Sequence, residues 1–249
     1  MQTERFGDID VAYRASGSGA PVVLLHGLAQ DGRMWAAQQR DLTDFSTYAY
    51  DLRGHGGTTL GDAKGTLPQL GQDLIAVLER FGPATCVGFS LGGTVALWVA
   101  AQRGDLVDSV VAIATSSIVG RAAAAGLEER IALCRSGDTE AVREMLLRDT
   151  AAQLAKGNVR AEDVIDERYE ATRDIAGYVN GATAMRWMRD HPLNDELARI
   201  SVPVLVVAGE LRHTRLGVVG HRPAELLELD LLTGDGLDHV GAGDEHVRG

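Results

Sequence analysis

Residues 88–92 read Gly88-Phe89-Ser90-Leu91-Gly92, and they decide the fold because they join an apolar, strand-like run to an apolar, helix-like run. The pattern G-x-S-x-G between a strand and a helix is typical of a nucleophile elbow, a sharp turn that lifts a serine hydroxyl above the edge of a sheet. The flanking glycines are needed where neighbouring backbone passes too close for a side chain. The alternative is that Ser90 only caps the helix.

Short apolar runs of strand length lie on both sides of this turn. Because the runs are continuous rather than alternating, they indicate strands covered on both faces, as in a mostly parallel sheet. Helical patterns at 67–81 and 92–102 separate them, and 5–15 could form an antiparallel edge hairpin. This alternation predicts an α/β sheet with helices on both faces. The expected strands are 21–25, 46–50, 85–89, 107–114, 203–208 and, as a sixth candidate, 226–232.

Residues 118–195 break this rhythm because they contain no strand-like run. We expect helices at 128–135, 139–153, 161–173 and 180–189. A purely helical block between two buried strands predicts an insertion above the sheet, a helical cap, rather than a second domain. The predicted core therefore comprises 1–117 and 196–249, and the cap comprises 118–195.

The composition limits the function. The 249 residues carry 24 Lys and Arg against 35 Asp and Glu, a net charge of −11, which argues against binding to nucleic acid or to an anionic membrane surface. Cys86 lies in an apolar run, so we expect it and Cys134 to be free thiols in a reducing, cytoplasmic setting. No residue spacing matches a metal-ligand set, and we expect no cofactor. A small-molecule substrate is the expected partner, and the oligomeric state stays open.

The loop after the 21–25 strand is placed to complete an anion-binding site. It begins His26-Gly27-Leu28, and we expect the backbone N–H of Leu28, together with that of Leu91, to hold an oxyanion. His26 could be a base, but we expect its ring to hydrogen-bond the loop backbone. We interpret the charged residues of the 51–56 segment, Asp51, Arg53 and His55, as a buried turn rather than a reaction centre.

Three motifs together resemble the α/β-hydrolase fold family: HGL at 26–28, DLRGHG at 51–56 and GFSLGG at 88–93. The resemblance extends over nearly the whole chain, including the helical cap and PVLVVAGE at 203–210. Two longer segments, HGLAQDGRMW at 26–35 and GYVNGATAMRWMRD at 177–190, resemble the 3-oxoadipate enol-lactonase-like branch of serine hydrolases.

The family pattern implies a base histidine after the last strand, and His239 occupies that place, with His246 ranked second. The family's acid usually stands three residues after the glycine that closes the 203–209 run, where this chain has Arg212. A cation there would lower the histidine pKa instead of orienting the ring. The remaining candidates are Glu210, Asp238 or no acid at all. Losing the acid of such a triad costs on the order of 10⁴ in turnover.

These observations predict a serine hydrolase of a small ester, lactone or enol-lactone, with Ser90 as nucleophile, His239 as base and Glu210 as the acid. The substrate pocket is expected between the sheet edge and the cap. One alternative is a lyase, cyclase or cofactor-free oxygenase on the same fold, which could operate with Arg212 in place. A second alternative is a non-catalytic protein that binds a small ligand. The expected pocket residues are His26, Trp35 and Trp187, with Met145 and Met188 as further candidates.

Overall fold

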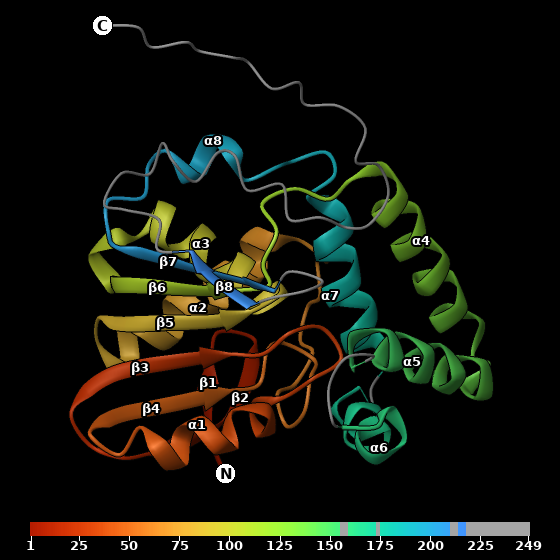
Figure 1. The fold of residues 1–249 in the computed structure, drawn as a ribbon, viewed down its shortest axis with the longest axis horizontal. Coiled ribbons are helices and arrows are strands. Elements are labelled where there is room, and N and C mark those ends of the chain that lie inside the picture. The colour runs from red at the N-terminus through yellow and green to blue at the C-terminus, as the bar shows by residue number, and fades with distance from the viewer. Residues whose placement is uncertain (155–158, 173–174, 210–213, 218–249) are drawn as a thin grey trace, which may run out of the picture.

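The computed structural model describes residues 1–154, 159–172, 175–209 and 214–217. These residues form one eight-stranded sheet in the order β1-β2-β4-β3-β5-β6-β7-β8 (Figure 1). The strands are β1 (Gln2–Phe6), β2 (Ile9–Ser16), β3 (Ala20–Leu25), β4 (Phe45–Tyr50), β5 (Ala84–Phe89), β6 (Val107–Ile113), β7 (Val204–Gly209) and β8 (Thr214–Gly217).

The centre of the sheet is parallel and its edges are antiparallel. Strands β4, β3, β5, β6 and β7 run in one direction, whereas β1, β2 and β8 join through antiparallel pairings. The predicted mostly parallel sheet with an edge hairpin is therefore confirmed. β8 was not predicted, because its sequence, TRLG, is too short and too polar to resemble a strand. The sixth expected strand, at 226–232, lies outside the described residues.

The register of the sheet brings the carboxyl ends of the parallel strands to one edge. Leu25 of β3 pairs with both Tyr50 of β4 and Gly88 of β5. Gly88 in turn pairs with Ala112 of β6, and Ala112 pairs with Val206 of β7. The loops that follow these strands consequently emerge side by side, which is where open α/β sheets bind their ligands.

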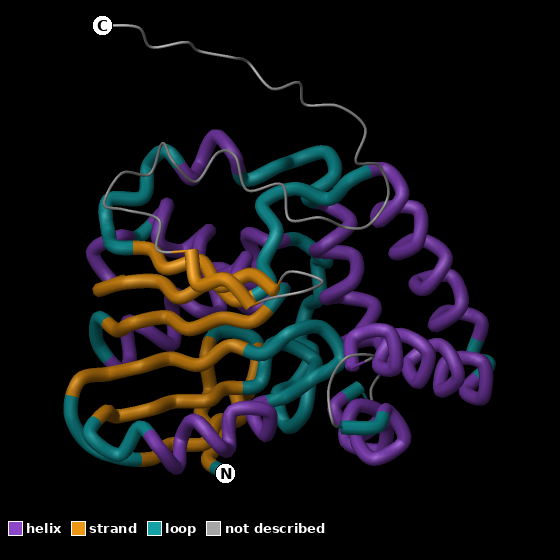
Figure 2. The backbone as a smooth tube through the Cα atoms, in the orientation of Figure 1, coloured by secondary structure: helices purple, strands orange, loops and turns teal. Residues whose placement is uncertain are grey.

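Helices cover both faces of the sheet and its carboxyl edge (Figure 2). The predicted helices at 67–81 and 92–102 are confirmed, whereas η1 and α1 were not predicted. The helices are η1 (Gly32–Trp35), α1 (Ala36–Asp41), α2 (Leu67–Phe81), α3 (Leu91–Gln102), η2 (Gly104–Leu106), α4 (Arg121–Ser136), α5 (Thr139–Leu154), α6 (Ala161–Ala171), α7 (Ile175–Trp187) and α8 (Asn194–Leu197).

Helix α2 shows how local sequence sets an element. The Thr66 hydroxyl accepts a hydrogen bond from the Gln69 N–H, and a proline occupies the first turn. Gly82 ends the helix at φ 95°, a conformation that favours glycine. The apolar face buries the leucines and valine that the periodicity predicts, Leu67, Leu70, Leu74, Val77 and Leu78, while Phe81 is half-buried.

Strand β3 divides its side chains between two apolar layers, as alternation along a strand requires. Val23 and Leu25 belong to the main core, which also contains the buried faces of α2 and α3. Val22 and Leu24 face the other way and pack with Trp35 of η1. The central strand is therefore buried on both faces, which explains its unbroken apolar run.

Four helices between β6 and β7, here called the cap helices (α4 to α7), lie beyond the carboxyl edge of the sheet (Figure 1). Helix α4 packs against α7, and α5 packs against α6. The predicted helical cap is thus present, although α4 begins at Arg121, seven residues before the expected start. The domain boundaries at 117/118 and 195/196 stay a prediction, and α8, which contacts α3, spans the second one.

Candidate active site

Ser90 occupies a strained turn between β5 and α3. Its backbone has φ 51° and ψ −116°, a region that non-glycine residues rarely adopt. The turn is held by the Ser90 N–H, which donates to the Ile113 carbonyl at 2.8 Å, and by the Thr94 N–H, which donates to the Ser90 carbonyl at 3.1 Å. Ser90 is half-buried rather than enclosed in the core. The strand–turn–helix geometry predicted from residues 88–92 is therefore present.

The glycines around Ser90 are required by close backbone contacts. A Cβ on Gly88 would lie 2.3 Å from the Gly93 nitrogen, and a Cβ on Gly92 would lie 2.5 Å from the Leu25 carbonyl oxygen. Both distances are far below van der Waals contact, and the neighbouring atoms are backbone that cannot move aside. Only glycine fits at either position, which is the physical reason for the sequence pattern.

The predicted oxyanion donors belong to two different segments at the carboxyl edge of the sheet. Leu91 is the first residue of α3, where a backbone N–H has no partner within the helix. Leu28 lies in the loop after β3, next to Ala29, which has φ 58°. Ala114, directly after β6, has φ 47°. Three non-glycine residues with positive φ thus follow three adjacent strand ends, and the roles of Leu28 and Leu91 stay predictions.

His26 has the structural environment that the sequence suggested. It is fully buried; Nε2 accepts a hydrogen bond from the Leu52 N–H at 2.8 Å, and Nδ1 lies 2.7 Å from the Gly27 carbonyl oxygen. This pattern requires a neutral ring that donates from Nδ1. Burial lowers the pKa of His26 to about 4, and it does the same for His55, whose ring lies 5.3 Å from that of His26.

The 51–56 segment is the buried charged turn that we expected. Asp51 is buried and accepts hydrogen bonds from the Gly32 and Gly57 N–H groups, each at 2.8 Å. Burial raises the pKa of Asp51 despite these donors. Arg53 is also buried and bonds through its guanidinium to both Asp8 and Asp73. Asp51 and Arg53 therefore hold the loop together, and both already have hydrogen-bond partners within the core.

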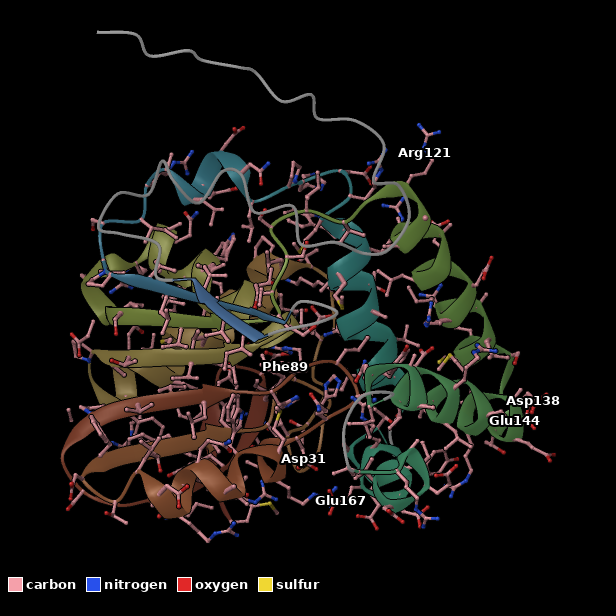
Figure 3. The ribbon with its side chains drawn as sticks, viewed as in Figure 1. Asp31, Phe89, Arg121, Asp138, Glu144 and Glu167 are labelled. Atoms are coloured by element: carbon pink, nitrogen blue, oxygen red, sulfur yellow. The ribbon has the colours of Figure 1, made fainter. Side chains whose placement is uncertain are left out.

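Two cavities separate the carboxyl edge of the sheet from the cap helices. The first, here called the serine cavity, has a volume of about 320 Å³, and Ser90, Leu28 and Phe89 form its floor. The second, the side cavity, has a similar volume and shares Phe89, Gln153 and Arg168 with the first. Figure 3 shows Phe89, Asp31 and Glu167, which line the side cavity, whereas Arg121 of α4, Glu144 of α5 and Asp138 in the turn between these helices lie farther out.

The cap side of the serine cavity combines charged and polar side chains with apolar ones. Arg130 of α4 donates two hydrogen bonds to Asp149 of α5, at 2.8 and 2.9 Å. Arg168 of α6 donates to the Thr150 hydroxyl at 2.8 Å and to Gln153 Oε1 at 2.6 Å. Burial lowers the pKa of Arg168, but an arginine remains charged at neutral pH. The remaining lining residues from the cap are Leu127, Leu146, Ala152, Tyr178 and Met185.

A second charged group connects the loop after β3 to α6. Arg33 bonds through Nε to Asp31, through Nη1 to Glu170 at 2.9 Å and through Nη2 to the Glu167 carbonyl at 3.0 Å. Burial of Asp31 opposes its ionisation, but the hydrogen bonds from Arg33 outweigh it and lower the pKa. The core and the cap therefore share an ionic contact at the rim of the side cavity.

The predicted pocket residues lie away from these two cavities. Trp35 is buried in the apolar layer behind β3, and Trp187 is half-buried and stacks on the His191 ring with the ring centroids 3.9 Å apart. His26 is beneath the loop, and Met145 and Met188 are buried in the core. None of the five lines either cavity. Their assignment to the substrate pocket stays a prediction without support from this geometry.

The sequence analysis missed the cap residues that do line the serine cavity. The sequence pattern of α6 could have indicated Arg168. The buried residues of this helix follow helical spacing and include the arginine: Ala161, Ile165, Arg168 and Ala171. This spacing places a charged residue on the apolar face of an amphipathic helix. A charge in such a position is unusual unless it is paired or functional.

The other members of the predicted triad lie outside the described residues. These are the base His239, its alternative His246, the acid candidates Glu210 and Asp238, and Arg212. Their roles stay predictions. Within the described part of the chain, no group of three or more His, Cys, Asp or Glu side chains could hold a metal ion. Cys86 and Cys134 are both free and buried, as expected.

The comparison with known proteins agrees with this geometry. The family model described as alpha/beta hydrolase fold matches residues 20–213. The chain belongs to the α/β-hydrolase fold family. Among its relatives is the pimeloyl-acyl-carrier-protein methyl ester esterase of Vibrio cholerae, 27% identical over 203 residues, which are 80% of this chain and 78% of that protein. The 3-oxoadipate enol-lactonase 2 of Acinetobacter baylyi is 28% identical over 211 residues, 81% of this chain and 76% of that protein.

Solved structures of α/β hydrolases share the architecture. A hydrolase from Pseudomonas aeruginosa superposes with a TM-score of 0.72 at 29% identity, covering 84% of this chain and 79% of that one. The enol-lactonase from Burkholderia xenovorans has the same TM-score at 24% identity, covering 84% and 81%, and supports the fold alone. None of the helices that the structure describes has both the length and the apolar character needed to cross a membrane. The predicted cytoplasmic location stays a prediction.

Proposed function

We propose that this α/β hydrolase cleaves a small carboxylic ester or lactone, of the enol-lactone kind, through an acyl-enzyme on Ser90. The esterase and enol-lactonase names of its relatives support ester or lactone hydrolysis as the reaction class. The observation that carries the proposal is the Ser90 turn, because its positive φ presents the side chain to a cavity between the core and the cap. A serine that only capped α3 would need neither the strain nor the cavity.

We propose a two-step reaction through Ser90 and His239. The Ser90 Oγ attacks the carbonyl carbon while His239 takes its proton, and the N–H groups of Leu28 and Leu91 stabilise the negative charge on the carbonyl oxygen. The C–O bond to the leaving group breaks, and His239 delivers the proton to that oxygen. Water then attacks the acyl-enzyme, giving one proton to His239, and the acid is released as Ser90 recovers its proton.

A fluorophosphonate probe tests the nucleophile directly. We expect mass spectrometry to find covalent modification at Ser90, which Ser90→Ala removes, while circular dichroism shows both proteins folded. His239→Ala is expected to abolish labelling, because the hydroxyl then has no base. Ester turnover should fall at least 10³-fold in Ser90→Ala. Absence of labelling in the wild type at every pH between 5 and 9 would contradict the acyl-enzyme mechanism.

The role of Glu210 is tested separately. If Glu210 supplies the carboxylate that Arg212 replaces at the usual position, Glu210→Gln lowers turnover by a factor approaching 10⁴ and slows fluorophosphonate labelling of Ser90 as well, because both reactions need the oriented histidine. An unchanged rate removes Glu210 from the mechanism. Arg212 also favours a second candidate function, a lyase or cyclase on the same fold, in which Ser90 and His239 transfer protons without forming an acyl-enzyme. Turnover without labelling would support this second function.

A further inference from the structure

The most unusual charge in the described structure is Arg168, on the inner side of α6. Its side chain is 8% exposed, and it contributes to the walls of both the serine cavity and the side cavity. Its two hydrogen-bond partners, the Thr150 hydroxyl and the Gln153 carboxamide, are neutral. The Thr150 hydroxyl donates its own proton to the Leu146 carbonyl at 2.6 Å, so it can only accept from the guanidinium.

The other arginines of the cavity walls have carboxylate partners. Arg130 is paired with Asp149, and Arg33 is paired with both Asp31 and Glu170. Across the described ranges, by contrast, no carboxylate lies within ion-pair distance of the Arg168 guanidinium. Asp149 is near enough to favour the charge of Arg168, but its two carboxylate oxygens are bonded to Arg130. Burying a cation without a directly bonded counter-ion is costly, and a protein that is acidic overall has many carboxylates available to pair with one.

The unused donors of Arg168 give it the capacity to bind a further group. A guanidinium carries five N–H donors in a planar fork, and two of them are used by Thr150 and Gln153. The other three find no acceptor in the described part of the chain. A planar fork with free donors matches the geometry of a carboxylate, which it binds through two parallel hydrogen bonds.

The charge balance indicates which cavity holds the anion. The charged residues of the serine cavity, Arg130, Asp149 and Arg168, sum to +1, whereas those of the side cavity, Asp31, Arg33, Glu167 and Arg168, sum to zero. The excess positive charge therefore favours a negative group in the serine cavity, whereas the side cavity has no such excess. With a volume of about 320 Å³, the serine cavity is large enough for a small-molecule ligand.

We propose that Arg168 is a specificity-determining residue that binds a free carboxylate on the substrate while the ester or lactone carbonyl lies at Ser90. The substrate class is then a monoester of a short dicarboxylic acid or a lactone that carries a carboxylate. This inference rests on the proposed ester hydrolysis for its kinetic test, but anion binding by Arg168 can be measured without any turnover.

The kinetic experiment compares each acid with an uncharged analogue of the same shape. The substrates are the monoethyl esters of succinic, glutaric and adipic acid, each alongside the analogue in which a carboxamide replaces the free acid. A hydrogen bond to a charged group contributes about 1.5–3 kcal/mol, so kcat/KM for the best acid should exceed that of its carboxamide by about 10- to 150-fold. Arg168→Met should remove this preference by raising KM for the acid, and Arg168→Lys should restore part of it.

The matched control is Arg143→Met on α5, which removes an exposed arginine paired with Asp166 and should leave the preference intact. Equal kcat/KM for acid and carboxamide in the wild type overturns the inference while leaving ester hydrolysis established. If Arg168→Met fails to fold, the wild-type ratio and the Arg168→Lys variant decide the matter. Calorimetry with glutarate gives the reading that is independent of turnover: we expect binding to the wild type that weakens at least tenfold in Arg168→Lys. Glutarate binding that is unchanged in Arg168→Lys and Arg168→Met overturns the inference even if no ester is hydrolysed.

Discussion

The two sides of the serine cavity are built by different means. On the sheet side, the Ser90 turn is fixed by backbone: adjacent strand ends, close glycine contacts and hydrogen bonds between main-chain groups. On the cap side, the wall is formed by side chains from four helices, α4 to α7, including the Arg130–Asp149 pair and Arg168. Substitutions on the sheet side therefore disturb the backbone of the Ser90 turn. Substitutions on the cap side can alter the charge or polarity of the cavity wall one side chain at a time.

The pH dependence of stability tests the sheet side most strongly. His26 and His55 have pKa values of about 4 in the folded protein and about 6.5 when unfolded. Between these values the unfolded chain binds more protons, so stability is full above pH 6.5 and is lost as the pH falls. Between pH 7.5 and 5, the free energy of unfolding should decrease by about 2 kcal/mol for each histidine, about 4 kcal/mol together.

Urea denaturation at the two pH values measures this change. The raised pKa of Asp51 acts in the opposite direction at the acidic end, so the histidine contribution is read as a difference between variants. His55→Gln should reduce the decrease by about half. A wild type whose midpoint is the same at pH 5 and pH 7.5, with a matching result for His55→Gln, would refute the neutral, buried state of these rings.

Gly88→Ala tests the backbone contacts of the turn. The added Cβ would lie 2.3 Å from the Gly93 nitrogen, so the turn must distort. We expect the free energy of unfolding to fall by about 3 kcal/mol and ester turnover to fall with it. Gly120→Ala is the control, because a Cβ at Gly120 meets nothing within 4 Å. Equal thermal stability of the two variants would show that the glycine contacts do not constrain the turn.

The smallest expected effect is on the cap side. Arg130 and Asp149 are partly exposed, at 34% and 24% of their side-chain surface, so solvent screens their attraction. A double-mutant cycle with Arg130→Met and Asp149→Asn should give a coupling energy of about 1 kcal/mol that decreases in 1 M salt. The more exposed pair Arg143–Asp166 is the reference and should give less than about 0.5 kcal/mol. A larger coupling in the reference pair would contradict this ranking.

The sequence was informative where backbone requirements restrict residue choice. The Ser90 turn, the strands on either side of it and α2 could be predicted because glycine positions, apolar runs and helical periodicity each have few structural interpretations. Helix α1 was missed because its segment, AAQQRD, has no apolar face, and its one buried side chain is Gln39. That glutamine is held by hydrogen bonds to Arg14 and Thr47, which no local pattern indicates.

The cap side of the site could not be predicted because its contacts join distant residues. Arg168 meets Thr150 and Gln153 across two helices, and Arg33 meets Glu170 from 137 positions away. Trp35 and Trp187 were predicted to line the pocket because they are large aromatic residues. Such rings also fill the core, as Trp35 does. A charged residue on the buried face of a helix is the more informative signal, since burying it carries a cost that needs a reason.

The positive φ angles of Ala29, Ser90 and Ala114 have a consequence for the energy of the whole molecule. Residues in such conformations each cost on the order of 1–3 kcal/mol, and three of them together rival the net stability of a typical domain. The five parallel strands behind this edge must therefore contribute more stabilising free energy than the strained residues cost. Packing inside the sheet thus keeps the strained residues at its carboxyl edge in the conformation that the proposed reaction needs.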